Sequence, residues 1–191
     1  PGLHDLYVSV VGDRSGVAML GYVGDAIAIS DVDGTLTASE SAVIETLVGG
    51  ENPAAQSDAA AMFRNLAARG IQVVYLTARG NQYTEATRSW LASRGFPRGP
   101  LRLAPSFATL PGDATVAFKR AAISALGIAV VAAIGNRASD ITAYTAAGVA
   151  ADRIYIKLPE YQSEVQGALD AGEARGFNDY PALNGLIDPS W

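Results

Sequence analysis

The sequence predicts an α/β protein with three layers, in which a parallel, Rossmann-like sheet is the middle layer. From Ala26 onward, short apolar segments of strand length alternate with segments of helical apolar spacing. The strand segments are apolar at nearly every position, which is typical of strands covered on both faces. The chain has 191 residues and is 49% hydrophobic, which suits one domain with a sizeable core. Strands separated by helices favour right-handed crossovers and therefore a parallel sheet.

The elements follow in a regular order. The predicted strands are residues 26–30, 71–76, 101–103, 128–134 and 153–156. The predicted helices are residues 57–69, 83–94, 114–126, 139–147 and about 160–171. Gly70, Gly95 and Gly127 each follow a helical segment, where a glycine commonly ends a helix. Residues 172–191 carry Pro181 and Pro189 and yield no clear element.

The N-terminal stretch predicts a β-hairpin. Residues 6–11 and 17–23 are rich in β-forming side chains and flank a Gly/Asp/Ser loop at 12–16. A lone hairpin is marginally stable, so it either extends the following sheet or is the end of an upstream β domain. We therefore expect a hairpin at 1–24, the α/β domain at 25–175 and a tail at 176–191. Pro1 in place of a starting methionine suggests a processed or excised chain.

The composition excludes several kinds of chemistry. There is no cysteine, so disulfides, zinc ribbons, iron–sulfur sites and cysteine nucleophiles are excluded. With His4 as the one histidine, histidine metal clusters are excluded and a Ser-His-Asp triad is disfavoured. Any catalysis must use carboxylates, hydroxyls, amides, lysine and arginine.

Charge and hydropathy limit the partners. The net charge of −5 argues against nucleic-acid binding and against simple adsorption to anionic membranes. The longest apolar run, residues 125–134, is far shorter than the roughly 20 residues that span a bilayer. We expect no transmembrane segment and see no secretory signal, and the compartment and oligomeric state stay open.

Polar side chains follow the first α/β strand. Asp31 and Asp33, two residues apart in extended backbone, would face one small volume and attract a divalent cation or share a proton. Gly34 allows a sharp turn, and Thr35 can donate to an anion. The competing interpretation is an Asp/Gly turn with helix-capping residues. A calcium loop is excluded, because the required glycine is at the fourth position instead of the sixth.

Two further candidates lie at the end of the second strand and in a later helix. Thr77, with Ala78 and Arg79 after it, ends the second strand before a helix and could hold a phosphate, or cap that helix. Lys119, one of two lysines, lies in an otherwise apolar helix, where a solvent-facing position is the alternative.

Asn136 and Asp140 follow the fourth strand, four residues apart, and would stack on one helix face. Their oxygens could complete a magnesium site, or Asn136 could cap the helix.

In this order, these motifs resemble those of the haloacid dehalogenase (HAD) superfamily of phosphatases. Further stretches, including Tyr75–Arg79, Gly99–Pro105 and Arg153–Tyr155, are similar to the lipin/Smp2 (LNS2) branch. That branch is shared by lipin phosphatidate phosphatases and by modules of phosphatidylinositol-transfer proteins. The resemblance covers about residues 26–160 and implies a HAD-like fold.

The resemblance also implies residue roles. Asp31 would be the nucleophile that forms an aspartyl-phosphate, and Asp33 the acid and base, with its carbonyl on Mg²⁺. Thr77 and Lys119 would complete the catalytic set. The implied metal group is Asp31, Asp33, Asn136 and Asp140, and the implied phosphate-binding group is Gly34, Thr35, Ala78 and Arg79.

The implied function is Mg²⁺-dependent hydrolysis of a phosphomonoester, with phosphatidate or another lipid phosphate at a membrane surface slightly favoured. Asp33 favours ester hydrolysis, since dehalogenases lack the second aspartate. The alternative is a non-catalytic module that binds phosphate head groups, although the intact Asp31 argues against it. Asn136, where most HAD proteins have aspartate, is shared with the lipin branch. Residues 38–56 predict a minimal flap instead of a cap domain.

Overall fold

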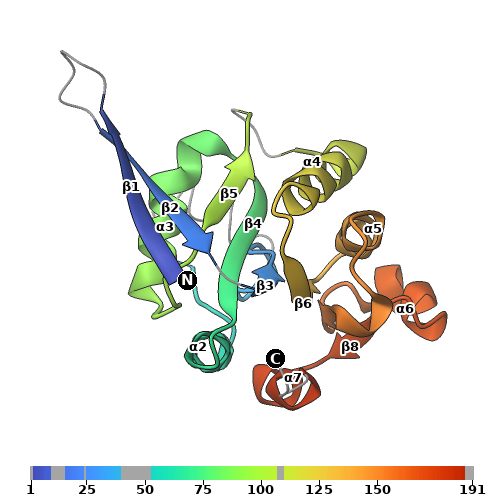
Figure 1. Cartoon of the computed structure of the whole chain (residues 1–191). Helices are drawn as coiled ribbons and strands as arrows, with labels where there is room; N and C mark the ends of the chain where they lie inside the picture. The colour runs from blue at the N-terminus through green and yellow to red at the C-terminus, as the bar shows by residue number, and fades with distance from the viewer. Residues whose placement is uncertain (1, 10–15, 24, 40–52, 107–109, 188–191) are drawn as a thin grey trace.

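A six-stranded parallel sheet forms the centre of the molecule (Figure 1). The computed structural model describes residues 2–9, 16–23, 25–39, 53–106 and 110–187. Within the sheet the strand order is β5-β4-β3-β6-β7-β8, and every neighbouring pair is parallel. The strands are β3 (Ala26–Ser30), β4 (Gln72–Gly80), β5 (Leu101–Ala104), β6 (Ala129–Gly135), β7 (Ile154–Lys157) and β8 (Arg175–Phe177).

Helices cover both faces of this sheet. One face packs against α2 (Ala59–Ala68), α3 (Thr84–Ser93) and α7 (Tyr180–Leu186) through a core cluster that includes Phe63, Trp90 and Leu183. The other packs against α4 (Gly112–Ser124), α5 (Ala138–Ala146) and α6 (Gln162–Asp170). Two short 3₁₀ helices, η1 (Asn81–Tyr83) and η2 (Ala151–Arg153), precede α3 and β7. The predicted three-layer fold is confirmed.

The predicted strands and helices between residues 26 and 171 are all present, with shifted ends. The largest difference is β4, which continues to Gly80, so that Thr77 and Arg79 lie within the strand. Its pairing with β5 is irregular between Thr77 and Gly80. Extended backbone there keeps the side chains of Thr77 and Arg79 on one side of the sheet.

The last strand and helix have no counterpart in the sequence prediction. β8 has only three residues and contains Gly176, so it has no recognisable strand pattern. In α7, Pro181 lies in the first turn, where proline is compatible with a helix, and Asp179 caps the start by accepting from the Ala182 amide at 2.8 Å. Pro181 and Pro189 leave no clear helical pattern in the sequence, because proline inside a helix usually ends it.

The predicted N-terminal hairpin is present. β1 (Gly2–Ser9) and β2 (Gly16–Val23) pair antiparallel and form a two-stranded sheet of their own. In the described residues they are not hydrogen-bonded to the six-stranded sheet, so the hairpin does not extend it. Most of the predicted flap, residues 40–52, lies outside the described residues; at its base Thr37 and Ala55 form an antiparallel bridge.

In the described ranges, no helix combines the length and the apolar character that crossing a bilayer requires.

Candidate active site

The loop after β3 is a tight turn at the carboxyl edge of the sheet. Val32 accepts hydrogen bonds from the amides of Leu36 at 2.8 Å and Thr37 at 3.1 Å. Gly34 has φ of +70°, and a Cβ there would lie 2.1 Å from Asn136 Nδ2. Glycine is therefore required at this position, both for the left-handed backbone and for the close approach of Asn136.

A buried lysine joins two carboxylates in this site. Lys119 Nζ, from α4, donates to Asp31 Oδ1 and to Asp140 Oδ1, each at 2.6 Å. All three residues are at most 4% exposed. Asp31 follows the central strand β3, and Asp140 lies in the first turn of α5. The fold thus brings together three predicted site residues from separate elements, and Lys119 does not face solvent.

The charges in this cluster are shifted by burial and by one another. Burial raises the pKa of Asp31 to about 7; Lys119 opposes this rise, while Asp140 and Asp33 add to it. Burial alone would lower the pKa of Lys119, but attraction by Asp140 and Asp31 outweighs it, so the pKa is raised and the lysine stays charged. Two carboxylates facing one ammonium leave the ionised cluster with a negative excess that suits a cation.

Asp140 has both carboxylate oxygens occupied. Oδ1 accepts from Lys119, and Oδ2 accepts from the backbone amides of Asn136 at 3.0 Å and Arg137 at 3.2 Å. A Cβ on Gly135 would lie 2.5 to 2.6 Å from atoms of Asp140, so glycine is needed next to it. Asp140 therefore holds Lys119 and the start of α5 in place.

One side-chain oxygen of Asp31 and one of Asn136 both face the hydroxyl of Thr35. Thr35 Oγ1 lies 3.3 Å from Asp31 Oδ2 and 3.3 Å from Asn136 Oδ1. Because one hydroxyl carries one hydrogen, it cannot donate to both oxygens at once. Asn136 is 1% exposed, and its Nδ2 has no hydrogen-bond partner among the described atoms.

This arrangement fits Mg²⁺, which prefers carboxylate, amide and carbonyl oxygens. Asp31 and Asn136 are the side chains that would hold it. The family resemblance adds the backbone carbonyl of Asp33. No cluster of three or more acidic or histidine side chains suited to a metal occurs in the described part of the chain. Any ion would therefore depend on the amide and on main-chain oxygen as well as on Asp31.

Asp33 has a different set of partners. Arg79 Nε lies 3.0 Å from both oxygens of Asp33, and Thr77 Oγ1 donates to Asp33 Oδ2 at 3.0 Å. Arg79 is 5% exposed, and its Nη1 also donates to Thr87 Oγ1 in α3 at 3.1 Å. Arg79 and Thr77, expected to contact phosphate, thus contact Asp33. Ala78 contributes a backbone carbonyl that accepts from the Leu110 amide at 3.1 Å.

Two residues near the site were missed by sequence reasoning. Tyr180 donates its hydroxyl to the carbonyl of Thr35 at 2.6 Å, from 145 residues further along the chain. Glu160, after β7, places Oε2 3.4 Å from the position that a Cβ of Gly34 would occupy. Neither residue lies in a motif, and no local pattern relates either of them to the loop after β3.

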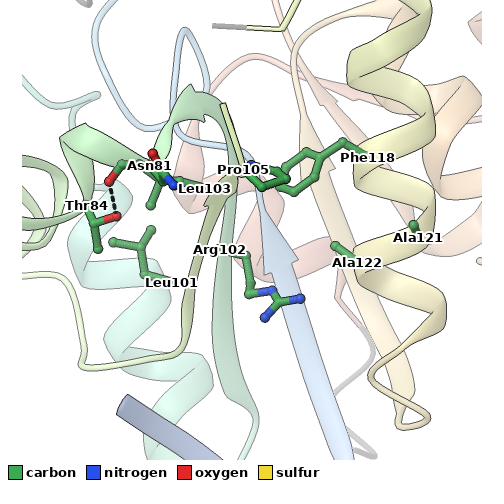
Figure 2. Close-up of a pocket in the computed structure, with 9 residues that line it drawn as sticks. All are labelled: Asn81, Thr84, Leu101, Arg102, Leu103, Pro105, Phe118, Ala121 and Ala122. Atoms are coloured by element: carbon green, nitrogen blue, oxygen red, sulfur yellow. Dashed lines mark hydrogen bonds between the residues drawn. The ribbon is translucent and has the colours of Figure 1, made fainter. Parts of the chain in front are cut away.

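A separate pocket of about 450 Å³ lies beside the edge strand β5 (Figure 2). Phe118, Ala121 and Ala122 of α4 line one side of it. Asn81 and Thr84 line the opposite side, and the rest of the lining is Leu101, Arg102, Leu103 and Pro105. None of the predicted site residues lines this pocket, although Phe118 directly precedes Lys119.

The family model described as "PITM 1-3, LNS2 domain" matches residues 28–157. The chain belongs to the LNS2 family. The match begins in β3 and ends at the last residue of β7, so it includes every element that carries a predicted site residue. The expected resemblance to the LNS2 branch of the HAD superfamily is confirmed.

Curated relatives are similar over this same region. Human phosphatidate phosphatase LPIN1 is 30% identical in an alignment 156 residues long, which covers 71% of this chain and 17% of LPIN1. Human membrane-associated phosphatidylinositol transfer protein 2 is 26% identical over 133 residues, or 70% of this chain and 9% of the relative. This LNS2 chain therefore spans less than a quarter of the length of these relatives.

A solved structure shares the fold. The D,D-heptose 1,7-bisphosphate phosphatase of B. bronchiseptica, complexed with magnesium and phosphate, superposes with a TM-score of 0.63 at 18% identity. The superposition covers 86% of this chain and 98% of that protein. At this level of identity the similarity establishes the HAD-like fold of the LNS2 chain.

Proposed function

We propose that this LNS2 chain is a Mg²⁺-dependent phosphomonoester hydrolase that acts through an aspartyl-phosphate. The observation that carries the proposal is the buried contact of Lys119 with Asp31 and Asp140, next to the oxygen of Asn136. An anionic nucleophile must approach an anionic phosphate, and fixed positive charge at that point lowers the electrostatic barrier. Bound Mg²⁺ would neutralise phosphate oxygens beside Asp31.

The residues divide the reaction between them. A carboxylate oxygen of Asp31 attacks phosphorus, and the bond from phosphorus to the ester oxygen breaks. Asp33 gives a proton to that leaving oxygen, then takes one from the water that attacks the aspartyl-phosphate. Hydrolysis releases phosphate and restores Asp31, while Lys119 stabilises negative charge in both steps.

Arg79 links substrate binding to the acid role of Asp33. In the structure its guanidinium contacts both carboxyl oxygens of Asp33. An incoming phosphate competes for the same guanidinium, because arginine binds phosphate and carboxylate through the same planar fork. Transfer of Arg79 to the substrate would free the carboxyl oxygens of Asp33 to face the leaving oxygen.

The proposed substrate class is a lipid phosphate such as phosphatidate. Support comes from the relatives named phosphatidate phosphatase. In addition, this LNS2 chain has every site residue that the family resemblance implies. A panel of short-chain phosphatidate in mixed micelles, glycerol 3-phosphate and an aryl phosphate separates the lipid from soluble esters. Faster hydrolysis of glycerol 3-phosphate than of phosphatidate would contradict the lipid proposal.

The alternative is a module that binds phosphate head groups without turnover. It is favoured by the relative named as a phosphatidylinositol transfer protein.

Hydrolysis of an aryl phosphate separates the two functions. We expect turnover that requires Mg²⁺ and that falls at least about a thousandfold in Asp31→Asn, which removes the nucleophile. Arg88→Gln, an exposed site in α3, is the control and should retain wild-type rates. Binding of phosphatidate vesicles with no turnover of any ester would support the binding module instead.

A further inference from the structure

The hydroxyl of Tyr180 connects the C-terminal helix to the catalytic loop. Tyr180 is the first residue of α7, is fully buried, and donates to the Thr35 carbonyl at 2.6 Å. Burial raises the pKa of Tyr180, so its hydroxyl keeps the proton that it donates. This hydrogen bond therefore links the last helix of the fold to the turn that follows its central strand.

Thr35 is the residue through which this contact reaches the site. Its own hydroxyl lies 3.3 Å from both Asp31 Oδ2 and Asn136 Oδ1. The turn around it is held by the Leu36 and Thr37 amides on Val32, while the Thr35 carbonyl is held by Tyr180. Fixing that carbonyl fixes the Thr35 backbone, and with it the direction of the Thr35 hydroxyl.

Tyr180 is itself rigidly supported. Its ring packs against Phe63 of α2, with centroids 6.0 Å apart, and edge-on against Phe177 of β8, at 5.3 Å. Asp179 caps α7 one residue earlier. The aromatic packing leaves the phenol little freedom, so its hydroxyl is a fixed donor and not an adaptable one.

We infer that Tyr180 is a positioning residue that sets the catalytic loop through the Thr35 carbonyl, and so holds the oxygens of Asp31 and Asn136 where a cation and a phosphate can use them. The inference rests on the proposed function for its catalytic consequence. Its structural part, control of residues 31–37 by Tyr180, stands without it. Small displacements of a nucleophile cost large factors in rate, so even a modest relaxation of the loop should be measurable.

The test compares Tyr180→Phe with Tyr75→Phe in the full chain. Tyr75 is a matched control: it is 1% exposed, belongs to the same core cluster, and donates its hydroxyl to the Pro97 carbonyl at 2.7 Å. Each variant loses one hydroxyl that donates to a main-chain carbonyl, in a buried bond for Tyr180 and in a part-buried bond for Tyr75. Both should lower the melting temperature by similar amounts, but only Y180F touches the catalytic loop.

Hydrogen exchange without metal or substrate is the first readout. We expect amides of residues 31–37 to exchange about tenfold faster in Y180F than in wild type, and at wild-type rates in Y75F. Asp179→Ala, at an exposed position that caps α7, should change the same amides in the same direction by a smaller factor. Equal exchange of these amides in Y180F and Y75F would overturn the inference.

Kinetics and metal binding are the second readout. For Y180F we expect kcat to fall about tenfold, KM to stay within about twofold, and the Mg²⁺ concentration that half-saturates the rise in melting temperature to increase severalfold. Y75F should change none of these. A wild-type chain that hydrolyses nothing contradicts the proposed function, while the exchange experiment still decides the role of Tyr180.

Discussion

At the scale of single residues, the charged side chains of the site are buried and therefore poorly solvated. Asp31 is 4% exposed and shares Lys119 with a second carboxylate. Burying two carboxylates beside one ammonium costs stability that an all-apolar arrangement would not. The protein keeps this arrangement where the central strand ends, which is the pattern expected for a functional site and not for a structural ion pair.

The raised pKa of Asp31 predicts how stability changes with pH. It is about 7 in the folded chain against 3.8 ordinarily, so between these values unfolding releases a proton and becomes easier as the pH rises. The Asp31→Asn variant has no carboxyl group at this position, so it lacks this fall in stability with rising pH. With EDTA present, we expect the unfolding free energy of D31N to rise relative to that of wild type by roughly 2–4 kcal/mol between pH 4 and pH 7. Above pH 7 the difference between the two proteins should level off.

Urea unfolding across this pH range measures the difference, and most other titrating groups cancel between the two proteins. A difference that stays constant or shrinks as the pH rises would contradict the assigned pKa direction.

At the scale of elements, the carboxyl ends of β3, β4 and β6 carry the polar groups, and α4 and α5 bring Lys119 and Asp140 to them. In a parallel sheet all these ends lie at one edge, so motifs far apart in sequence meet there. The last two elements matter as well. β8 pairs with β7, and α7 covers one face of the core with Tyr180 and Leu183.

Two leucines of α7 test its contribution to stability. Leu183 is fully buried, whereas Leu186, in the same helix, is 42% exposed. We expect Leu183→Ala to lower the unfolding free energy by about 2–5 kcal/mol, because it leaves a cavity in the core. Leu186→Ala should change it by less than about 1 kcal/mol. Chemical denaturation measures both, and equal effects would show that α7 does not pack as described.

At the scale of the whole molecule, the six-stranded sheet with its helices forms one body, and the hairpin β1–β2 forms a separate small sheet. We propose that the boundary near residue 24 separates the α/β domain from a hairpin that folds as a sheet of its own.

Removal of residues 1–24 tests this boundary. We expect the shortened chain to melt within a few degrees of the full one and to keep the proposed Mg²⁺-dependent turnover, because β1 and β2 pair with each other and add no strand to the six-stranded sheet. Differential scanning calorimetry and the aryl phosphate assay provide the measurements. Loss of cooperative unfolding would show that the hairpin is an integral part of the fold.

The sequence by itself predicted the α/β fold, the order of elements to residue 171 and the residues that meet at the sheet edge. Such features depend on local periodicity and on where a strand ends, and both can be read from neighbouring positions. The motifs at those strand ends also carry the resemblance to the LNS2 branch.

Only the tertiary structure decided how those residues pair. In the folded chain Arg79 contacts Asp33, and both carboxylate oxygens of Asp140 accept hydrogen bonds. Tyr180, from a segment with no predicted element, donates to Thr35. These contacts join residues between 3 and 145 positions apart, in geometry set by side-chain rotamers and packing. A hydrogen bond depends on tenths of an ångström, and no periodic pattern along the chain carries that information.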